Sequence, residues 1–291
     1  MDQLAQAATF IVLYGVSYGL VLFVISIGLV LTLGLMRIAN LAHGVFAVLG
    51  GYLAFKLPAA VGLGFVGSAL LAVALVVVVS VVLERIFFRF LFGMTELEQV
   101  LATIGMCFAF IGLLTFAFGP NVLATKYPDW LAGNVNLLGR PFPVYRVFVM
   151  IAGLLILVGL WVLFDRTDFG ATLRACVDNQ SMAKASGINV DWYFSVTFAI
   201  GAGLAALGGI VGAGMLPLEP LYPFKHLPLF LTIVALSGFG NIKASVVVSL
   251  VVGVVDTAGR YLVPQLGAFT VFTLLVVLVL WRPHGLLTRW K

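Results

Sequence analysis

The stretch from Trp192 to Leu216 reads WYFSVTFAIGAGLAALGGIVGAGML and contains no Lys, Arg, Asp or Glu. A helix needs about 20 apolar residues to cross the hydrocarbon layer of a bilayer, so this stretch is long enough to span a membrane. Its many glycines favour close contact with other helices inside a bilayer. The stretch therefore indicates an α-helical membrane protein.

The composition of the whole chain supports the same fold class. The chain has 291 residues, of which 63% are hydrophobic and 9% are charged, whereas soluble domains carry about 25% charged residues. Its mean hydropathy is +1.19. These values exclude a water-soluble globule, a disordered chain and a nucleic-acid-binding protein. The net charge of +5 then reflects basic loops beside lipid head groups, so membrane lipid is an expected partner and nucleic acid is not.

Further apolar segments predict an all-α polytopic protein with a single transmembrane domain, residues 1–291. The continuous spans that we expect are Phe10–Leu33, Gly62–Leu83, Val100–Phe118, Val144–Phe164, Trp192–Leu216, Ala244–Ala258 and Gly267–Trp281. Two more segments, Ile38–Leu57 and Pro228–Asn241, are apolar but interrupted. We therefore expect about eight or nine membrane segments, two of them broken or half helices. No basic residue precedes the first apolar run, so we expect that run to be an uncleaved first span.

The distribution of Lys and Arg in short loops predicts the orientation. If every segment crosses and the N-terminus is outside, ten of the 16 basic residues lie at inner helix ends. We therefore expect the N-terminus outside and the C-terminus in the cytoplasm. If the segment Pro228–Asn241 is re-entrant, every later span reverses. Two longer loops remain, residues 119–143 on the outside and residues 165–191 on the cytoplasmic side.

The cytoplasmic loop carries the signals of a short helix. Asp178 or Asn179 can cap a helix from Gln180 to Ala185, because a short polar side chain can accept a free N–H group there. Gly187 stands where a left-handed helix terminator belongs. We expect a short amphipathic helix that lies along the membrane face.

Three other local patterns predict polar contacts at helix ends. Asp191 can cap the span that follows the cytoplasmic loop. Thr95 and Glu98 have the Thr-x-x-Glu spacing of a capping box. Asp256 lies one helical turn before Arg260, so the two side chains can form an ion pair at the end of a helix.

Polar residues interrupt the first broken segment and are candidates for a substrate path. Asn40, His43 and Gly44 stand inside an apolar run. Polar side chains at membrane depth are costly and usually face the bundle interior or a water-filled path. A second interpretation remains equally open, in which Asn40 and His43 bond only to each other or to nearby backbone.

The second broken segment contains Ser237, Gly238, Phe239 and Gly240. Two interrupted spans in opposite halves of a chain are typical of a substrate path between inverted repeats. The letters around the two breaks do not by themselves show a repeat. The Gly-Phe-Gly string also matches part of a potassium-channel filter, but a glycine hinge where backbones pack is the favoured alternative.

The sequence has no pattern of an enzyme. No lysine follows a glycine, so there is no phosphate-binding P-loop and we expect no ATP hydrolysis by this chain. The three histidines are widely separated and Cys107 and Cys176 are far apart, so the sequence supports neither a metal site nor a disulfide framework. We expect no metal, no cofactor and no catalytic residue.

The segment RACVDNQSMAKASGINVD, Arg174 to Asp191, resembles the coupling segment of ABC importer permeases of the branched-chain amino acid type, and is nearest the shorter of their two membrane subunits. Other family-like stretches follow in the same order: NLAHG at residues 40–44, LER at 83–85, TIGM at 103–106, TFAIGAGLAALGG at 197–209 and RPHGLL near the C-terminus. One stretch departs from the family. Its members usually have Gly-Gly-x-Gly-Ser-x-x-Gly at the second break, where this chain has SGFGNIKA, residues 237–244.

The resemblance implies an inverted-repeat permease subunit in the bacterial inner membrane. It implies a second homologous permease subunit as partner, although a second copy of this chain remains open, together with two cytoplasmic ATPase subunits and a periplasmic substrate-binding protein. The residues that it assigns to ATPase coupling are Arg174, Asp178, Asn179, Met182, Ala183 and Gly187.

The resemblance leaves several functions open. It implies a branched-chain amino acid as the first choice of solute, with urea, short amides and aromatic acids as alternatives within the family. An ion-gradient-driven transporter that uses Asp256 as its buried carboxylate is the alternative outside the family. A channel built on the Gly-Phe-Gly string is a further alternative.

Overall fold

The computed structural model describes residues 2–36, 38, 40–91, 93–137, 140–238 and 240–281. Within these ranges the chain forms helices and one short β-hairpin. In chain order the elements are α1 (Asp2–Met36), α2 (His43–Val61), α3 (Phe65–Leu83), the π-helix η1 (Glu84–Phe88), α4 (Arg89–Leu91), α5 (Glu96–Phe118), the 3-10 helix η2 (Asp129–Leu131), β1 (Asn134–Leu137), β2 (Arg140–Pro143), α6 (Val144–Asp165), α7 (Asp168–Asp178), α8 (Gln180–Ala185), α9 (Val190–Gly212), α10 (Tyr222–Ser237), α11 (Ile242–Leu262) and α12 (Gly267–Trp281).

The predicted all-α membrane fold is confirmed. Six helical stretches in the described part are long and apolar enough to cross a membrane: Gln6–Gly34, Phe65–Leu91, Glu96–Phe118, Val144–Asp165, Val190–Gly212 and Ile242–Leu262. Helices α2, α10 and α12 occupy the three remaining predicted segments. Each predicted segment therefore contains a helix, and the number that crosses stays a prediction.

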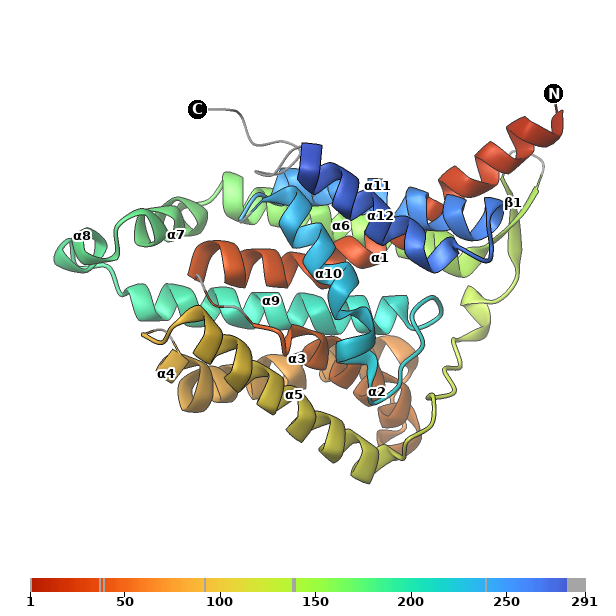
Figure 1. The fold of residues 1–291 in the computed structure, drawn as a ribbon. Helices are drawn as coiled ribbons and strands as arrows, with labels where there is room; N and C mark the ends of the chain where they lie inside the picture. The colour runs from red at the N-terminus through yellow and green to blue at the C-terminus, as the bar shows by residue number, and fades with distance from the viewer. Residues whose placement is uncertain are drawn as a thin grey trace.

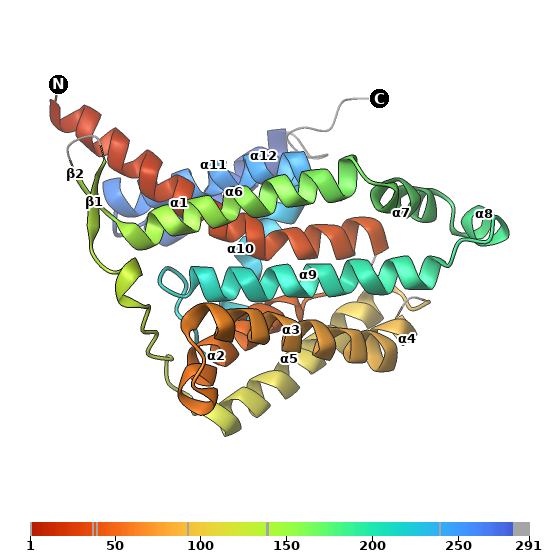
Figure 2. The ribbon, with the colours of Figure 1, turned by 180° about the vertical axis from the view of Figure 1, so that it is seen from behind.

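The helices form a bundle with two different ends (Figures 1 and 2). The start of α1 and the strands β1 and β2 lie at one end, which we call the hairpin end. Helices α7 and α8 project from the opposite end, which we call the α8 end. Helices α1 and α9 run through the middle, with α2, α3 and α5 on one side and α6, α11 and α12 on the other.

Burial separates central helices from peripheral ones. In the most apolar stretch of α1, 89% of the residues are buried, and in that of α9 67% are buried, against 22% for each of α3, α5 and α6. The peripheral helices expose large apolar side chains such as Leu70, Phe116 and Leu155. Large exposed apolar surfaces mark contact with a membrane or a partner. Helices α1 and α9 therefore form the core, and the peripheral helices face lipid or other subunits.

Glycines let the central helices touch through their backbones. A Cβ atom added to Gly15 of α1 would lie 2.6 Å from the Cα of Val254 in α11. A Cβ atom on Gly50 of α2 would lie 2.6 Å from the Cα of Ala206 in α9. Neither position leaves space for a side chain. Small residues at crossings allow such close approach, which agrees with the high glycine content.

The helix ends confirm one predicted cap and correct another. Thr95 and Glu98 form the expected capping box at the start of α5. The prediction that Asp191 caps α9 is wrong. Asn189 is the cap, and its Oδ1 accepts the N–H of Trp192 at 3.1 Å. Because Asn189 satisfies this free N–H group from outside the helix, the Asp191 carboxylate is left to form ion pairs.

The loop of residues 119–143 contains η2 and the antiparallel hairpin of β1 and β2. Two tyrosines attach this region to the end of α9. The hydroxyl of Tyr127 donates to the carbonyl of Ile210 at 3.2 Å, and the hydroxyl of Tyr145 donates to the carbonyl of Val211. The loop is therefore fixed against the hairpin end of the core.

Candidate functional site

The first break lies between the end of α1 at Met36 and the start of α2 at His43, inside the bundle. Asn40 and His43 are 0% and 1% exposed. The Nε2 atom of His43 is 2.9 Å from the carbonyl oxygen of Ile25, and Asn40 Oδ1 accepts the N–H of Ala42 at 3.1 Å. Both side chains therefore bond to backbone, but the Nδ2 atom of Asn40 is buried without a hydrogen-bond partner among the described residues, so both interpretations stay open.

Helices α5 and α10 cover the first break. Thr103 Oγ1 accepts the N–H of Leu41 at 3.3 Å, and the Cys107 thiol donates to the carbonyl of Leu41 at 3.5 Å. Gly44 lies against α10, where an added Cβ atom would be 2.9 Å from the Cα of Pro223. Irregular backbone at membrane depth must find its hydrogen bonds within the protein. The first break meets this requirement by close packing.

The second break joins α10 to α11 and depends on glycine. Gly238 and Gly240 have φ angles of +76° and +75°, in the region that favours glycine. Ser237 is 1% exposed, and its hydroxyl donates to the carbonyl of Val234 at 3.2 Å. The remaining candidate, Phe239, lies outside the described residues. The chain therefore bends here through backbone freedom instead of through packing.

Two residues in the stretch that departs from the family pattern, Asn241 and Lys243, have structural roles at the second break. Asn241 caps α11, and its Oδ1 accepts the N–H of Ala244 at 3.0 Å. Lys243 forms an ion pair with Asp165, the last residue of α6, with an N–O distance of 2.9 Å. Asn241 therefore caps the helix that follows the bend, and Lys243 attaches the bend to α6.

A cavity of about 570 Å³, which we call the second-break cavity, lies beside this bend. Its lining includes Gly240 and Lys243 from the bend, Leu31 from α1, and Arg174 from α7. Arg174 also donates from Nη1 to the carbonyl of Phe164, at 2.5 Å. A residue assigned to coupling and a residue assigned to the substrate path thus share one cavity. The first-break candidates Asn40, His43 and Gly44 do not line it.

The coupling candidates form two short helices at the α8 end (Figure 1). Asp178 is the last residue of α7, and Asn179 caps α8 by accepting the N–H of Met182 at 2.9 Å. Of the two caps that the sequence allowed, Asn179 is the one used. Gly187 has φ +82°, as expected for a terminator. The predicted short helix is therefore present at Gln180–Ala185.

Neighbouring residues of α8 face opposite environments. Met182 is 67% exposed, whereas Ala183 is 5% exposed. An exposed apolar side chain on a projecting helix can enter a groove of a partner. Met182 is thus available for docking, and Ala183 fixes α8 to its own chain.

A polar pocket of about 470 Å³ lies between α8 and the helices of the bundle. Asp191 pairs there with Arg89 at 3.1 Å and with Lys184 at 3.8 Å. On another wall, Ser195 donates to Glu84 at 2.8 Å. Arg89 and Asp191 cannot be recognised as partners from local sequence, because they are 102 residues apart. Exposed pairs of this kind contribute about 0–1 kcal/mol each, so they position α8 more than they stabilise the fold.

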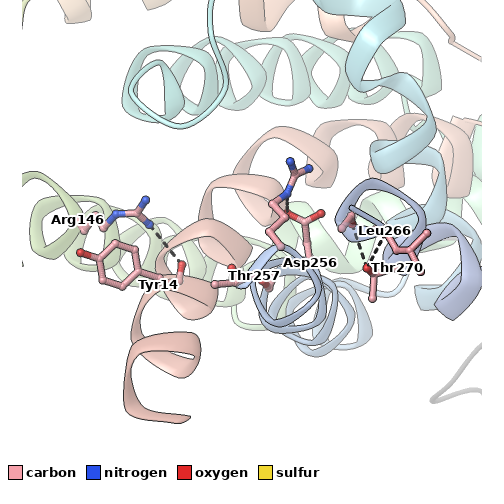
Figure 3. Close-up of polar contacts among 9 residues, drawn as sticks. Tyr14, Arg146, Asp256, Thr257, Leu266 and Thr270 are labelled. Atoms are coloured by element: carbon pink, nitrogen blue, oxygen red, sulfur yellow. Dashed lines mark hydrogen bonds and ion pairs between the residues drawn. The ribbon is translucent and has the colours of Figure 1, made fainter. Parts of the chain in front are cut away.

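A third cavity, of about 740 Å³, opens at the hairpin end, and we call it the Arg146 cavity. The guanidinium of Arg146 lies 4.2 Å from the centre of the Tyr14 ring. Its Nη1 atom donates to Ser17 Oγ at 2.9 Å. The same atom donates to the carbonyl of Tyr14 at 3.4 Å (Figure 3). The predicted pair of Asp256 and Arg260 is confirmed on another wall, with an N–O distance of 2.7 Å. Local sequence gives Arg146 no role, because its partners Ser17 and Met215 come from distant segments.

The described ranges contain neither a candidate metal site nor a disulfide bond. No three His, Cys, Asp or Glu side chains there are close enough to hold a metal ion. Cys107 and Cys176 are buried and unpaired. Burial also raises the pKa of the Cys176 thiol, and a raised pKa disfavours the reactive thiolate.

Comparison with known proteins identifies the family. Residues 11–281 match the family model described as the branched-chain amino acid transport system permease component. The solved structure of PsaBC from Streptococcus pneumoniae in complex with Fab is similar over 92% of this chain and 89% of that chain, with a TM-score of 0.49 and 16% identity.

Two curated relatives cover nearly the whole chain. The high-affinity branched-chain amino acid transport system permease protein LivH of Salmonella typhimurium is 26% identical over 94% of each chain. The corresponding protein BraD of Pseudomonas aeruginosa is 28% identical, also over 94% of each chain. Because the family match extends from residue 11 to residue 281, the chain belongs to the permease components of branched-chain amino acid transport systems.

Proposed function

We propose that this chain is the permease subunit of an ABC importer that carries a branched-chain amino acid, or a similar small solute, across the bacterial inner membrane. The names of the relatives LivH and BraD support this choice of solute. The chain works with a second permease subunit, two ATPase subunits and a periplasmic binding protein. ATP hydrolysis belongs to the ATPases, and this chain has no catalytic role.

The projecting helix α8 is the observation that carries the proposal. It is capped by Asn179, ended by Gly187, and exposes Met182 at the end of the bundle. Such a short, fixed helix can transmit a push or pull from an ATPase. Helix α7 connects it to the second-break cavity through Arg174. Movement of α8 would therefore reach the bend between α10 and α11.

Helix α10 provides the connection between the two ends. Its residues Lys225 and His226 line the Arg146 cavity, and its other end leads to Gly240 at the second-break cavity. The helix has 16 residues, about 24 Å of length. In this proposal the α8 end and the C-terminus are cytoplasmic, and the N-terminus and the hairpin end are outside, where the binding protein delivers solute.

The ion-gradient alternative depends on Asp256 as a free acid. This carboxylate is instead paired with Arg260 at 2.7 Å. The ion pair occupies this carboxylate, so Asp256 is not a free acid that could bind a coupling ion. Leucine uptake that continues with ATP after an uncoupler has removed the ion gradient would support the ABC importer.

A substitution on α8 tests the coupling role. Met182→Glu is expected to abolish ATP-driven leucine uptake and the stimulation of ATPase activity by the binding protein, in proteoliposomes that contain all the subunits. The matched control is Val122→Glu, because Val122 is also exposed, at 55%, but lies in the loop at the hairpin end. Normal uptake by the Met182→Glu protein at a normal membrane level would contradict the proposal.

A further inference from the structure

The Arg146 cavity contains a cation that has no acidic partner. Arg146, Lys225 and Arg260 line the cavity. Lys225 pairs with Glu219 at 2.5 Å, and Arg260 pairs with Asp256. Among the residues that the structure describes, Arg146 forms no ion pair. After pairing, one positive charge therefore remains in the cavity, and it belongs to Arg146.

The groups around Arg146 are neutral and leave part of the guanidinium free. The Tyr14 carbonyl, the Ser17 hydroxyl and the Met215 sulfur all lie near the single nitrogen Nη1. Across the described residues, Nε and Nη2 have no hydrogen-bond acceptor. A guanidinium is a planar fork that suits the two oxygens of a carboxylate. A partly buried cation that has no counter-charge is costly, and such charges in membrane proteins often belong to functional sites.

The rest of the cavity suits a small solute with an apolar side group. Aromatic and aliphatic residues such as Tyr18, Leu229 and Phe272 line the walls. The volume of about 740 Å³ lies in the usual range for small-molecule sites. The Nε2 atom of His226, a lining residue that is 7% exposed, has no hydrogen-bond partner within the described ranges. A bound solute would give this buried nitrogen a partner.

We propose that the Arg146 cavity is the site where the permease receives its solute, and that Arg146 binds the solute's carboxylate. This inference rests on the proposed importer function and adds a location and a recognition group to it. Arg146 sits near the start of α6 and the cavity also touches α10 and α11. A solute held there would lie beside the helix that leads to the second break.

A cysteine reporter can measure occupancy of the cavity without measuring transport. Thr257 lines the cavity, so Thr257→Cys places a thiol there, while Cys107 and Cys176 stay buried. The rate of its reaction with the impermeant reagent methanethiosulfonate ethylsulfonate is measured in proteoliposomes that contain all the subunits. The labelling rate with leucine-loaded binding protein is compared with the rate with leucine-free binding protein. This comparison separates the effect of leucine from the effect of docking.

The Arg146 variants are made in this reporter chain. For each variant, the labelling rate with leucine is compared with the rate without leucine. We expect leucine to slow labelling at least tenfold with Arg146, about threefold with Arg146→Lys and not at all with Arg146→Gln. Lys126→Gln is the control, because Lys126 is exposed on the same end of the bundle and does not line the cavity. It is expected to keep the full tenfold protection.

Several outcomes would overturn the inference. Equal protection with Arg146→Gln would mean that the carboxylate is bound elsewhere. Absence of protection in a reporter chain that still takes up leucine would place the path outside the cavity. If labelling without leucine is slow only when phosphatidylglycerol is added, Arg146 binds a lipid phosphate instead of the solute. Failure of ATP-driven uptake in the unmodified transporter would instead reject the proposed function, independently of the labelling result.

Discussion

At both breaks, polar and glycine residues interrupt an apolar run, but the two breaks have different surroundings. At the first break, Asn40 and His43 are fully enclosed, and Gly44 touches the backbone of α10. At the second break, Gly240 lines a cavity, and Lys243 keeps 74% of its side chain exposed. We infer that the first break is a closely packed joint, whereas the second has room to change shape. Interruption of a span therefore does not by itself identify a moving part.

The largest expected effect is at the first break. Gly44→Val should lower the free energy of unfolding by about 3 kcal/mol, because the new side chain would push into the backbone of Pro223. The measurement is an SDS titration of the purified protein followed by circular dichroism. Gly105→Val is the matched control, since an added Cβ atom there meets nothing within 4 Å. Equal unfolding curves for the two variants would show that the first break is not closely packed.

At the second break, backbone conformation should matter more than packing. Gly238→Ala should cost about 2 kcal/mol, because φ +76° with ψ 154° is accessible almost only to glycine. Gly64→Ala is the control, because Gly64 also lies outside a helix interior but has φ −64° and open space around it. The same SDS titration distinguishes them. A Gly238→Ala protein as stable as the control would mean that the bend does not need glycine.

The cap of α11 should have a smaller effect. Asn241→Ala removes the acceptor for the N–H of Ala244 and should lower the free energy of unfolding by about 1 kcal/mol. Asn241→Ser should restore most of this loss, since serine is also a good cap. If the serine variant is as unstable as the alanine variant, Asn241 acts through some contact other than the cap.

The smallest effect is expected at the ion pair of Lys243 and Asp165. Because the lysine side chain is 74% exposed, Lys243→Ala should change the free energy of unfolding by no more than about 0.5 kcal/mol. The difference should disappear in high salt, which screens exposed charges. A loss well above 1 kcal/mol would mean that the second break is held as firmly as the first, and the contrast between them would fail.

Features that depend on neighbouring residues were predictable from the sequence. The helical segments follow from runs of apolar residues, and the caps at Thr95 and Asn179 follow from short polar side chains at fixed spacing. The pair of Asp256 and Arg260 follows from one helical turn. The cap at Asp191 was mispredicted because Asn189, two residues earlier, satisfies the same helix end.

Features that depend on distant segments were not predictable. Residue 44 meets residue 223, and residue 89 meets residue 191, only after the bundle has formed. The residues next to Arg146 in the sequence do not mark it as a site. Its neutral neighbours in space come from α1 and from the chain after α9. Asn40 and Gly240 lie at interruptions of the helices, as the sequence predicted. The enclosure or exposure of such residues depends on which helices cover them, and their role in a substrate path stays a prediction.

Contact between backbones also limits how this family can diverge. Where Gly15 meets Val254 and Gly50 meets Ala206, an added Cβ atom would lie 2.6 Å from a backbone Cα atom of the opposite helix. A substitution at either glycine cannot be compensated by a single change in the opposite helix, because the atom it meets is a Cα. Evolution would have to shift a whole helix to accept it. Relatives as distant as 26% identity are therefore expected to keep glycine at these crossings while their outer surfaces change freely.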